Sequence, residues 1–389
     1  MLQPMNLKWT CTLALLIILL IVGSLPVLAE SNQDSAVVNQ AVAVATELFK
    51  STNPYDQISG AGTLTDIGDG DALKVLISYA KSEDFVYQRS AIDTLTHVQH
   101  PRGLDAVYRI AANTPQALHF LTQSLATNPR EEMGEFLVGV LASDKPLIQQ
   151  YALQALVHIP EVDVIEPTKA LVANESTRRS TRAYAYYLLA SRGLGAEIED
   201  ELMALIKHGD LDAKEVAAVA LAFVPGDSAR ETIKQLKRSE DARVQLAALA
   251  TDASFGNKES LQEFSRIITH GKNMNAEVAA SAVRRLPDDL LKEVTDEVIK
   301  ENIRPNPAAR LLESWRNVGR VPKSVYEWGL SHSNEDIVTQ TLWLVGQRQE
   351  RDMLQKIAPF LNHATPMVRG MAAWAAVHIA PELYTAPAI

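Results

Sequence analysis

The sequence predicts an all-α fold, an α-solenoid (superhelix) of about eleven helix pairs, from a repeated apolar frame and from the residues that end each copy. Three stretches align without gaps: Ala152 to Pro160, Ala217 to Pro225 and Ala279 to Pro287. Each has Ala at its first and fourth positions, Leu or Val at the fifth, an aliphatic residue at the eighth and Pro at the ninth. Positions 1, 4, 5 and 8 form one face of a helix, and Pro ends a helix. Each copy is therefore expected to be one amphipathic helix.

The spacing of the copies gives the period. The same frame recurs with starts near these residues: Gly60, Ala91, Leu121, Ala183, Ala247, Ala309, Val338 and Ala372. From residue 60 to residue 372 there are ten intervals in 312 residues, a mean of about 31. In the Gly60 and Val338 copies a glycine, Gly68 or Gly346, stands near the end of the frame, where it is expected to stop the helix.

A second apolar-periodic segment lies between successive copies, as at residues 71–80, 134–142 and 228–236. Asp69, Asp71 or Asp227 stands where a helix N-cap is needed. The stretch Gly68 to Asp71 is accordingly interpreted as a turn and cap, because a helical pattern follows it rather than the spaced oxygen ligands of a calcium loop. One helix pair cannot bury both of its faces, so neighbouring pairs are expected to stack around a continuous core. Residues 301–333 are irregular and indicate a degenerate repeat or a bend.

The repeat frame resembles HEAT repeats of the short bacterial type, including the HEAT-like repeats of bilin lyases. The copies that carry the resemblance best are Leu147 to Leu156 and Pro366 to Ala375, and it extends over nearly all of residues 41–381. An arginine that commonly follows the first aliphatic residue is present at Arg369 and absent from most other copies. The resemblance implies a superhelix with the second helices on its concave face. It also implies an alternative function, that of a lyase or a cofactor-attachment and assembly factor, by analogy of fold alone.

The first 29 residues have the pattern of an export signal. Lys8 precedes an apolar run over residues 9–22, and Val27-Leu28-Ala29 supplies a small-residue cleavage site after Ala29. The alternative is an uncleaved membrane anchor, which would make the protein a tethered assembly factor. The expected organisation is a signal peptide (1–29), an N-terminal segment (30–40), a repeat solenoid (41–384) and a frayed tail (385–389). The expected location is the periplasm.

The cysteine content and the net charge exclude some kinds of site and some classes of binding partner. The only cysteine, Cys11, would leave with the signal, so the mature chain would have no disulfide and no thiolate site. Removing Lys8 leaves 36 basic against 47 acidic side chains, or −11. Such an acidic chain is not expected to bind nucleic acid or an anionic membrane surface.

Three histidines, His97, His158 and His378, precede a β-branched residue and could be a spaced set of metal ligands. All three stand at the seventh position of the frame, where other copies have Phe223, Arg285, Asp66 and Leu344. A position that accepts those side chains is not specified by metal chemistry, so a rim or partly packed location is expected. None of the nine histidines precedes a glutamate, unlike the His-Glu pairs of the di-iron deoxyhypusine hydroxylases, which resemble this architecture. No catalytic motif, metal site or cofactor site is expected.

Two groups of side chains are candidates for binding a partner. Arg178, Arg179 and Arg182 form a basic cluster, and arginine suits carboxylate recognition. Trp315, Tyr326 and Trp328 form an aromatic cluster that could anchor a partner; Tyr184, Tyr186 and Tyr187 form another. The alternatives are a solvated helix face for the arginines and packing between repeats for the aromatic residues. The sequence thus favours a non-catalytic scaffold with a protein or peptide partner on its concave face.

Overall fold

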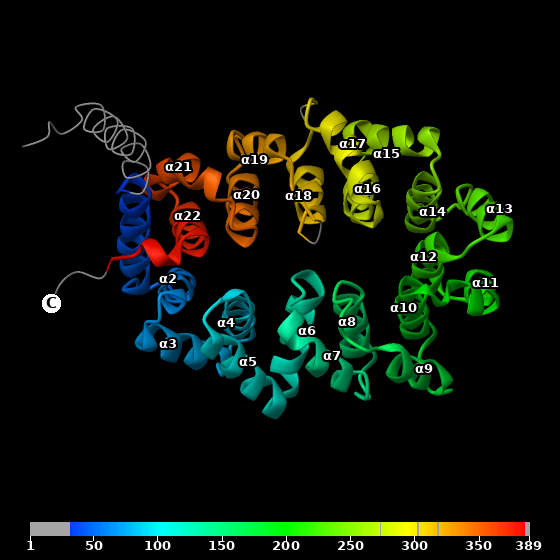
Figure 1. Cartoon of the computed structure of the whole chain (residues 1–389), viewed down its shortest axis with the longest axis horizontal. Helices are drawn as coiled ribbons and strands as arrows, with labels where there is room; N and C mark the ends of the chain where they lie inside the picture. The colour runs from blue at the N-terminus through cyan, green and yellow to red at the C-terminus, as the bar shows by residue number, and fades with distance from the viewer. Residues whose placement is uncertain (1–31, 273, 302, 317–318, 386–389) are drawn as a thin grey trace, which may run out of the picture.

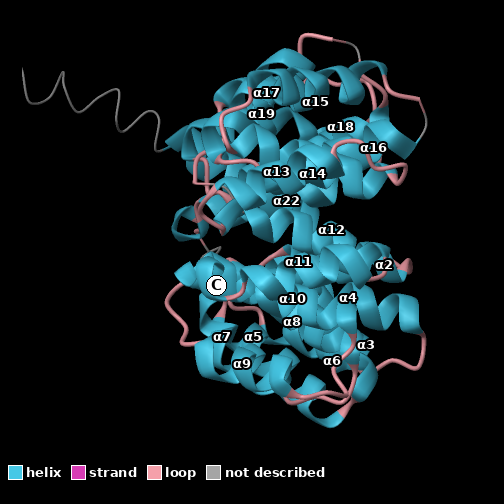
Figure 2. Ribbon diagram, turned by 90° about the vertical axis from the view of Figure 1, so that its right-hand side faces the viewer, coloured by secondary structure: helices cyan, strands magenta, loops and turns pink. Residues whose placement is uncertain are grey.

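The computed structural model describes residues 32–385 apart from 273, 302 and 317–318. All regular structure within these residues is helical, and short loops join the helices (Figure 2). None of the described helices is both long and apolar enough to cross a membrane. The expected signal peptide, residues 1–29, lies outside the described part of the chain.

Eleven helices form the inner wall of a ring (Figure 1). Each of them contains one copy of the frame, so the predicted repeat and its period are confirmed. They are α2 (Pro54–Asp66), α4 (Phe85–His97), α6 (Pro115–Thr127), α8 (Pro146–Val157), α10 (Arg179–Leu189), α12 (Leu211–Ala220), α14 (Ala242–Ser254), α16 (Met274–Ala282), α18 (Pro305–Ser314), α20 (Glu335–Gln347) and α22 (Pro366–Ile379).

The outer helices return the chain between successive inner helices (Figure 1). The first is the N-terminal helix, residues 32–49, which packs closely against α2 where Ala45 and Phe49 meet Gly60. The others are α3 (Gly70–Ala80), α5 (Pro101–Asn113), α7 (Gly134–Val140), α9 (Ile165–Ala173), α11 (Glu199–His208), α13 (Asp227–Leu236), α15 (Lys258–His270), α17 (Asp288–Val298), α19 (Lys323–Leu330) and α21 (Leu354–Ile357). Single turns of tighter helix extend or link them: η1 (Glu131–Met133), η3 (Gly195–Glu197), η4 (Leu221–Phe223), η5 (Val283–Arg285), η6 (Arg351–Met353), η7 (Ala358–Asn362) and η8 (Pro381–Leu383), with a wider π turn at η2 (Ala190–Leu194).

The N-cap residues predicted from the sequence are confirmed in part. Asp69 accepts hydrogen bonds from the backbone of Asp71 and Ala72, so the turn-and-cap interpretation of residues 68–71 is confirmed. Asp227 instead occupies the first turn of α13, and Gly226, at φ 107°, is its N-cap. Arginines cap C-termini across repeats: Arg192 donates to the carbonyls of Leu156, Val157 and Ile159 at the end of α8.

The ring closes because α22, the last inner helix, packs against α2, the first (Figure 1). His378 of α22 and Asp66 of α2 lie 3.0 Å apart, and their side chains are 4% and 2% exposed. Asp66 also accepts a hydrogen bond of 2.6 Å from the backbone of Gln99. Trp374 packs on the His378 ring, with 4.3 Å between ring centroids. The sequence predicts an α-solenoid and does not say whether its ends meet. In the structure the two ends pack against each other, and we call the junction the seam.

Polar contacts of the N-terminal helix complete the seam. Asn39 bonds to Thr385, and Gln40 to Asn362, at 3.2 Å and 3.0 Å between side-chain atoms. This helix runs without a break across residue 40, where a boundary between an N-terminal segment and the solenoid is expected. The expectation of a frayed tail concerns residues 385–389, of which Thr385 alone is described, and Thr385 is held by Asn39.

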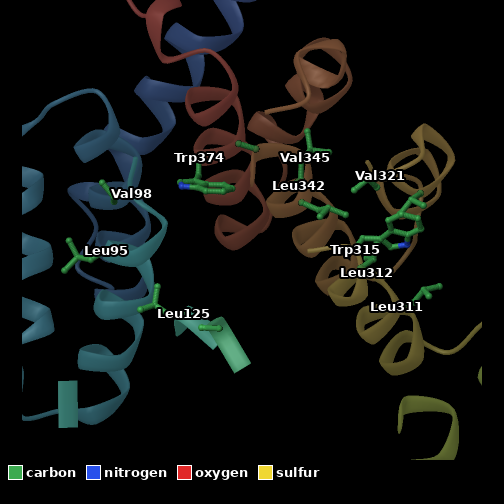
Figure 3. Close-up of a cluster of buried hydrophobic side chains, with 14 of the residues drawn as sticks. Leu95, Val98, Leu125, Leu311, Leu312, Trp315, Val321, Leu342, Val345 and Trp374 are labelled. Carbon is green, nitrogen blue, oxygen red and sulfur yellow. The ribbon is translucent and has the colours of Figure 1, made fainter. Parts of the chain in front are cut away.

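The apolar core follows the ring and crosses the seam. One cluster of buried side chains runs from the N-terminal helix to α10 and from α14 to α22, and a second covers α10 to α14. Figure 3 shows part of the first, with Leu342, Val345 and Trp374 on neighbouring inner helices. The irregular stretch at residues 301–333 contains α18 and α19, an inner and an outer helix, and is therefore a degenerate repeat within the ring.

The helix ends one residue after Gly346, close to where the frame predicts, but Gly346 is itself helical and does not cap the end. It is the last but one residue of α20, where an added Cβ would stand 2.6 Å from Cζ3 of Trp374 and 2.8 Å from Cα of Ala375. The glycine is needed because α20 and α22 approach each other closely there, so its role is packing.

Candidate functional site

The inner helices enclose a lumen, which we define as the connected pockets between opposite walls of the ring. Because an outer helix returns the chain each time, the inner helices all run in the same direction. Their N-termini therefore lie at one rim of the ring and their C-termini at the other. Three neighbouring pockets share lining residues: Tyr55, Ser90 and Asp93 line the first two, and Thr127 and Arg316 line the second and third. The lumen thus extends from the seam to the far side of the ring.

The rim at the N-termini carries most of the exposed large apolar side chains of the described residues. Of the nine large apolar side chains exposed in the described residues, seven occupy the first or second position of an inner helix. They are Tyr55, Phe85, Val86, Leu147, Leu211, Met274 and Met367. Apolar groups gathered at one rim of a ring are typical of a surface that meets another molecule.

The chamber next to the seam, about 550 Å³, is apolar and aromatic. Its walls include Ile58, His97, Trp343, Met371 and Trp374. The indole of Trp374 points from α22 toward the side of the ring where α4 lies (Figure 3). The rings of His97 and Trp343 meet edge to face, with 5.5 Å between centroids, so α4 and α20 touch across the lumen.

One more contact crosses the lumen: Gln347 of α20 donates a hydrogen bond of 3.0 Å to Asn128, which follows α6. On the same wall as α20, the guanidinium of Arg316, which follows the neighbouring helix α18, stacks on the ring of Trp343 at 4.5 Å. Since these residues lie near the C-termini of the inner helices, the contacts narrow that end of the lumen.

The far chamber, about 300 Å³, is basic. Arg284, Arg285 and Arg316 line it together with His158, Tyr184 and Tyr187. Burial raises the pKa of both tyrosines, so their hydroxyl groups stay protonated and can donate hydrogen bonds. Burial, with Arg284 and Arg192 adding to it, lowers the pKa of His158, so its imidazole is neutral at neutral pH.

The acidic groups of this chamber already have partners. Arg285 donates to Glu215 at 2.6 Å, and Glu215 also accepts from Arg243. Glu313 pairs with Arg310 at 2.8 Å, and Asp288 accepts from the backbone of Gly319 at 2.9 Å.

Arg284 differs from these groups, because its guanidinium makes no hydrogen bond or ion pair within the described residues. It is open to the lumen, yet protein surrounds it closely enough that burial lowers its pKa. An arginine nevertheless keeps its charge. The far chamber therefore presents a charged guanidinium with no directly bonded partner among the described residues.

The three histidines of the frame occupy different environments. His378 is buried at the seam, while His97 and His158 line different chambers. Burial lowers the pKa of His97 more than the carboxylate and carbonyl of Asp93 raise it. Among the described residues, no group of three or more His, Cys, Asp or Glu side chains is placed to hold a metal ion.

The arginine cluster expected to bind a partner lies at the N-terminus of α10. Arg178 is exposed, Arg179 donates to the carbonyl of His208, and Arg182 donates to the carbonyls of Asn174 and Glu175. Two of the three thus hold the ends of outer helices, while Arg178 and Arg179 are both exposed to solvent.

The aromatic candidates are mostly inside the fold. Trp315 is 1% exposed and donates to the hydroxyl of Thr295, and Tyr326 is fully buried and donates to Glu350. Trp328 is half-buried against His332. Neither Trp315 nor Tyr326 can reach a partner, because both side chains fill the core between helices. The sequence pattern did not identify Arg284 or Arg316 as site residues. The one sequence feature that could have identified them is their position at the end of an inner helix.

A larger groove, about 1050 Å³, lies outside the ring between α5 and α7. Tyr108 and Phe136 line it, with 5.4 Å between ring centroids. It competes with the lumen as a binding surface, and Asp105 and Glu135 place carboxylates in its lining.

Comparison with known proteins gives no family. No family model matches the chain, and no curated protein matches it. The specific bacterial and bilin-lyase type of the repeat therefore stays a prediction.

Solved structures are similar only in part. An engineered protein is 18% identical over 88% of this chain and 99% of its own, with a TM-score of 0.27. Kap121p bound to Nup53p is 13% identical over 87% of this chain, with a TM-score of 0.29, and this chain spans 41% of its length. A protein with tumor overexpressed gene (TOG) domain arrays, solved in a study of tubulin recruitment, is 11% identical over 87% of this chain and 94% of its own, with a TM-score of 0.28. At these scores the likenesses carry no argument about function.

Proposed function

We propose that this protein is an exported, non-catalytic interaction scaffold that receives a segment of a partner protein in its lumen, through the rim at the N-termini of the inner helices. The observation that carries the proposal is the apolar rim at the mouth of a lumen that runs across the ring. Tyr55, Val86 and Met367 belong to both the rim and the pocket walls, so the rim leads directly into the lumen.

The dimensions fit a polypeptide segment. The seam chamber and the far chamber, about 550 Å³ and 300 Å³, each have the size of a few side chains. Apolar side chains of the segment would lie against Trp343, Met371 and Trp374. Export is part of the proposal and is supported by the signal pattern at residues 1–29.

Site-specific photocrosslinking in an envelope fraction tests the function. The photoreactive amino acid p-benzoylphenylalanine is placed at Arg89 in the lumen, at Tyr108 in the outer groove, and at Gln235 on α13 as an exposed control. We expect one stoichiometric protein adduct from Arg89 and none from Gln235. An adduct from Tyr108 without one from Arg89 would move the binding surface to the outer groove and overturn the proposal.

Mass spectrometry of the mature protein tests the export step. A first residue at Glu30 is expected. A chain that retains residues 1–29 would instead be a membrane-tethered factor, the alternative that the sequence leaves open.

A further inference from the structure

We propose that the far chamber is a carboxylate-binding subsite, in which Arg284 and the hydroxyl groups of Tyr184 and Tyr187 bind an acidic side chain of the segment held in the lumen. The inference deepens the proposed function, since it gives the chemistry of the occupant. It can also stand without it, because the subsite can be tested with small probes.

The first argument is charge. Each carboxylate that lines or borders the chamber is engaged: Glu215 by two arginines, Glu313 by Arg310 and Asp288 by a backbone amide. Arg284 is left with its guanidinium unpaired within the described residues. The Arg284 side chain is exposed to the lumen, so its N–H groups are free to form charge-assisted hydrogen bonds with an anionic ligand.

The second argument is the set of donors. A guanidinium presents its N–H groups as a planar fork that fits a carboxylate through two parallel hydrogen bonds. Two protonated tyrosines, Tyr184 and Tyr187, supply further O–H donors from α10 in the same chamber. His158 is neutral at neutral pH and adds no competing charge.

The third argument is the net charge of the whole protein, which affects which segments can enter the lumen. The chain carries a net charge of −10, so its outer surface repels acidic segments in general. A basic chamber inside an acidic ring would bind an acidic group locally, and apolar side chains that contact the rim and the seam chamber would add to the affinity of a longer segment. The predicted occupant is therefore a segment with apolar residues and at least one Asp or Glu.

Isothermal titration calorimetry on the whole protein tests the subsite with three probes: the acidic peptide acetyl-Glu-Glu-Glu-amide, its neutral counterpart acetyl-Gln-Gln-Gln-amide, and glutarate. We expect the acidic peptide to bind at least tenfold more tightly than the neutral one, and its affinity to fall as salt is raised. Equal affinity for glutarate would support the carboxylate chemistry and assign the site to free small acids. Equal binding of the neutral peptide, or no binding of either anion, would overturn the proposal.

Variants distinguish a specific effect of Arg284 on binding from a nonspecific effect of positive charge. Arg284→Gln should weaken the acidic peptide at least tenfold, and Arg284→Lys less. Arg238→Gln removes an exposed arginine after α13 and should change nothing. Circular dichroism confirms that each variant is folded; should Arg284→Gln not fold, the double variant Tyr184→Phe/Tyr187→Phe replaces it and should weaken binding severalfold. Unchanged affinity in a folded Arg284→Gln protein would refute the role of this residue. If crosslinking in the lumen fails while the peptide still binds at Arg284, the subsite stands and the scaffold function does not.

Discussion

Glu215 connects three consecutive inner helices. Its carboxylate, on α12, accepts from Arg285 just after α16 at 2.6 Å and from Nε of Arg243 on α14 at 2.7 Å. Burial by itself raises the pKa of Glu215, but the charges and hydrogen bonds of the two arginines together lower it below its ordinary value. A carboxylate with a lowered pKa stabilises the fold above its unfolded pKa, and this stabilisation is lost as the pH falls through the folded value.

Glu215→Gln should therefore lower the free energy of unfolding at pH 7 by about 1–3 kcal/mol, the usual contribution of a hydrogen bond to a charged group. The difference from the wild type should shrink as the pH falls below about 4.5, where the unfolded carboxyl becomes protonated. Urea unfolding at pH 7, 5 and 3.5, followed by circular dichroism, measures it. Glu231→Gln, at an exposed pair with Lys234, is the control and should have no effect. A difference that stays constant down to pH 3.5 would show that the ionised carboxylate is not what stabilises the ring.

Single residues show where sequence reasoning succeeds and where it ends. The frame assigned the three histidines to one structural position, and all three lie at the C-terminal ends of inner helices. The expected rim or partly packed location is wrong for His378, which is buried at the seam. The frame could not foresee that Asp66 and His378, seventh residues of the first and last copies, pair with each other across 312 positions of the chain. Such a pair depends on the curvature accumulated over all repeats, and no local pattern encodes it.

Elements were more predictable than contacts between them. The apolar positions of the frame identify all eleven inner helices of the described chain, because burial against a neighbour on one face imposes the helical period. Pro160, Pro225 and Pro287 follow helix ends as expected. The helix end at Gly346 was predicted to within one residue, but the role of the glycine was misinterpreted, because a glycine that ends a helix and a glycine at a close helix crossing look the same in sequence.

A tightly packed glycine and a glycine with open space around it should respond in opposite ways to substitution by alanine. Gly346→Ala should destabilise the protein by about 1–3 kcal/mol, because the new methyl group would collide with Trp374 and Ala375 of α22. Gly139→Ala in α7, where an added Cβ meets nothing within 4 Å, should stabilise it by up to about 1 kcal/mol through helix propensity. Urea midpoints of the two variants check the pair. A neutral or stabilising Gly346→Ala would mean that α20 and α22 are not as close as described.

At the scale of the whole molecule, closure gives every inner helix two neighbours. In an open solenoid the terminal repeats need polar caps, since their outer faces lack a partner. Here α22 covers α2, and the apolar core continues across the seam. The seam should consequently behave like any other interface between repeats, and the position of the chain ends should matter little to stability.

A circular permutant tests this equivalence. The new chain begins at Gly226, runs to Thr385, continues through a Gly/Ser linker to Asn32, and ends at Pro225; both cut residues are exposed. Thr385 bonds to Asn39, about two helical turns from residue 32, so a linker of about eight residues spans the distance. In an open array of eleven pairs the ends would lie on the order of 100 Å apart, out of reach of that linker.

We expect the permutant to keep the helical circular dichroism and the radius of gyration of the parent chain in small-angle X-ray scattering. Its free energy of unfolding should lie within about 1–2 kcal/mol of the parent value, the range of a single altered connection. The matched control is the same permutant with Gly370→Leu, since a side chain there would meet Ser59 and Leu48 within 3.1 Å and push α22 from α2. That control should be less stable and more expanded. An expanded or aggregated permutant without the substitution would show that the ends do not meet, and the lumen would then be an open concave face rather than an enclosed space.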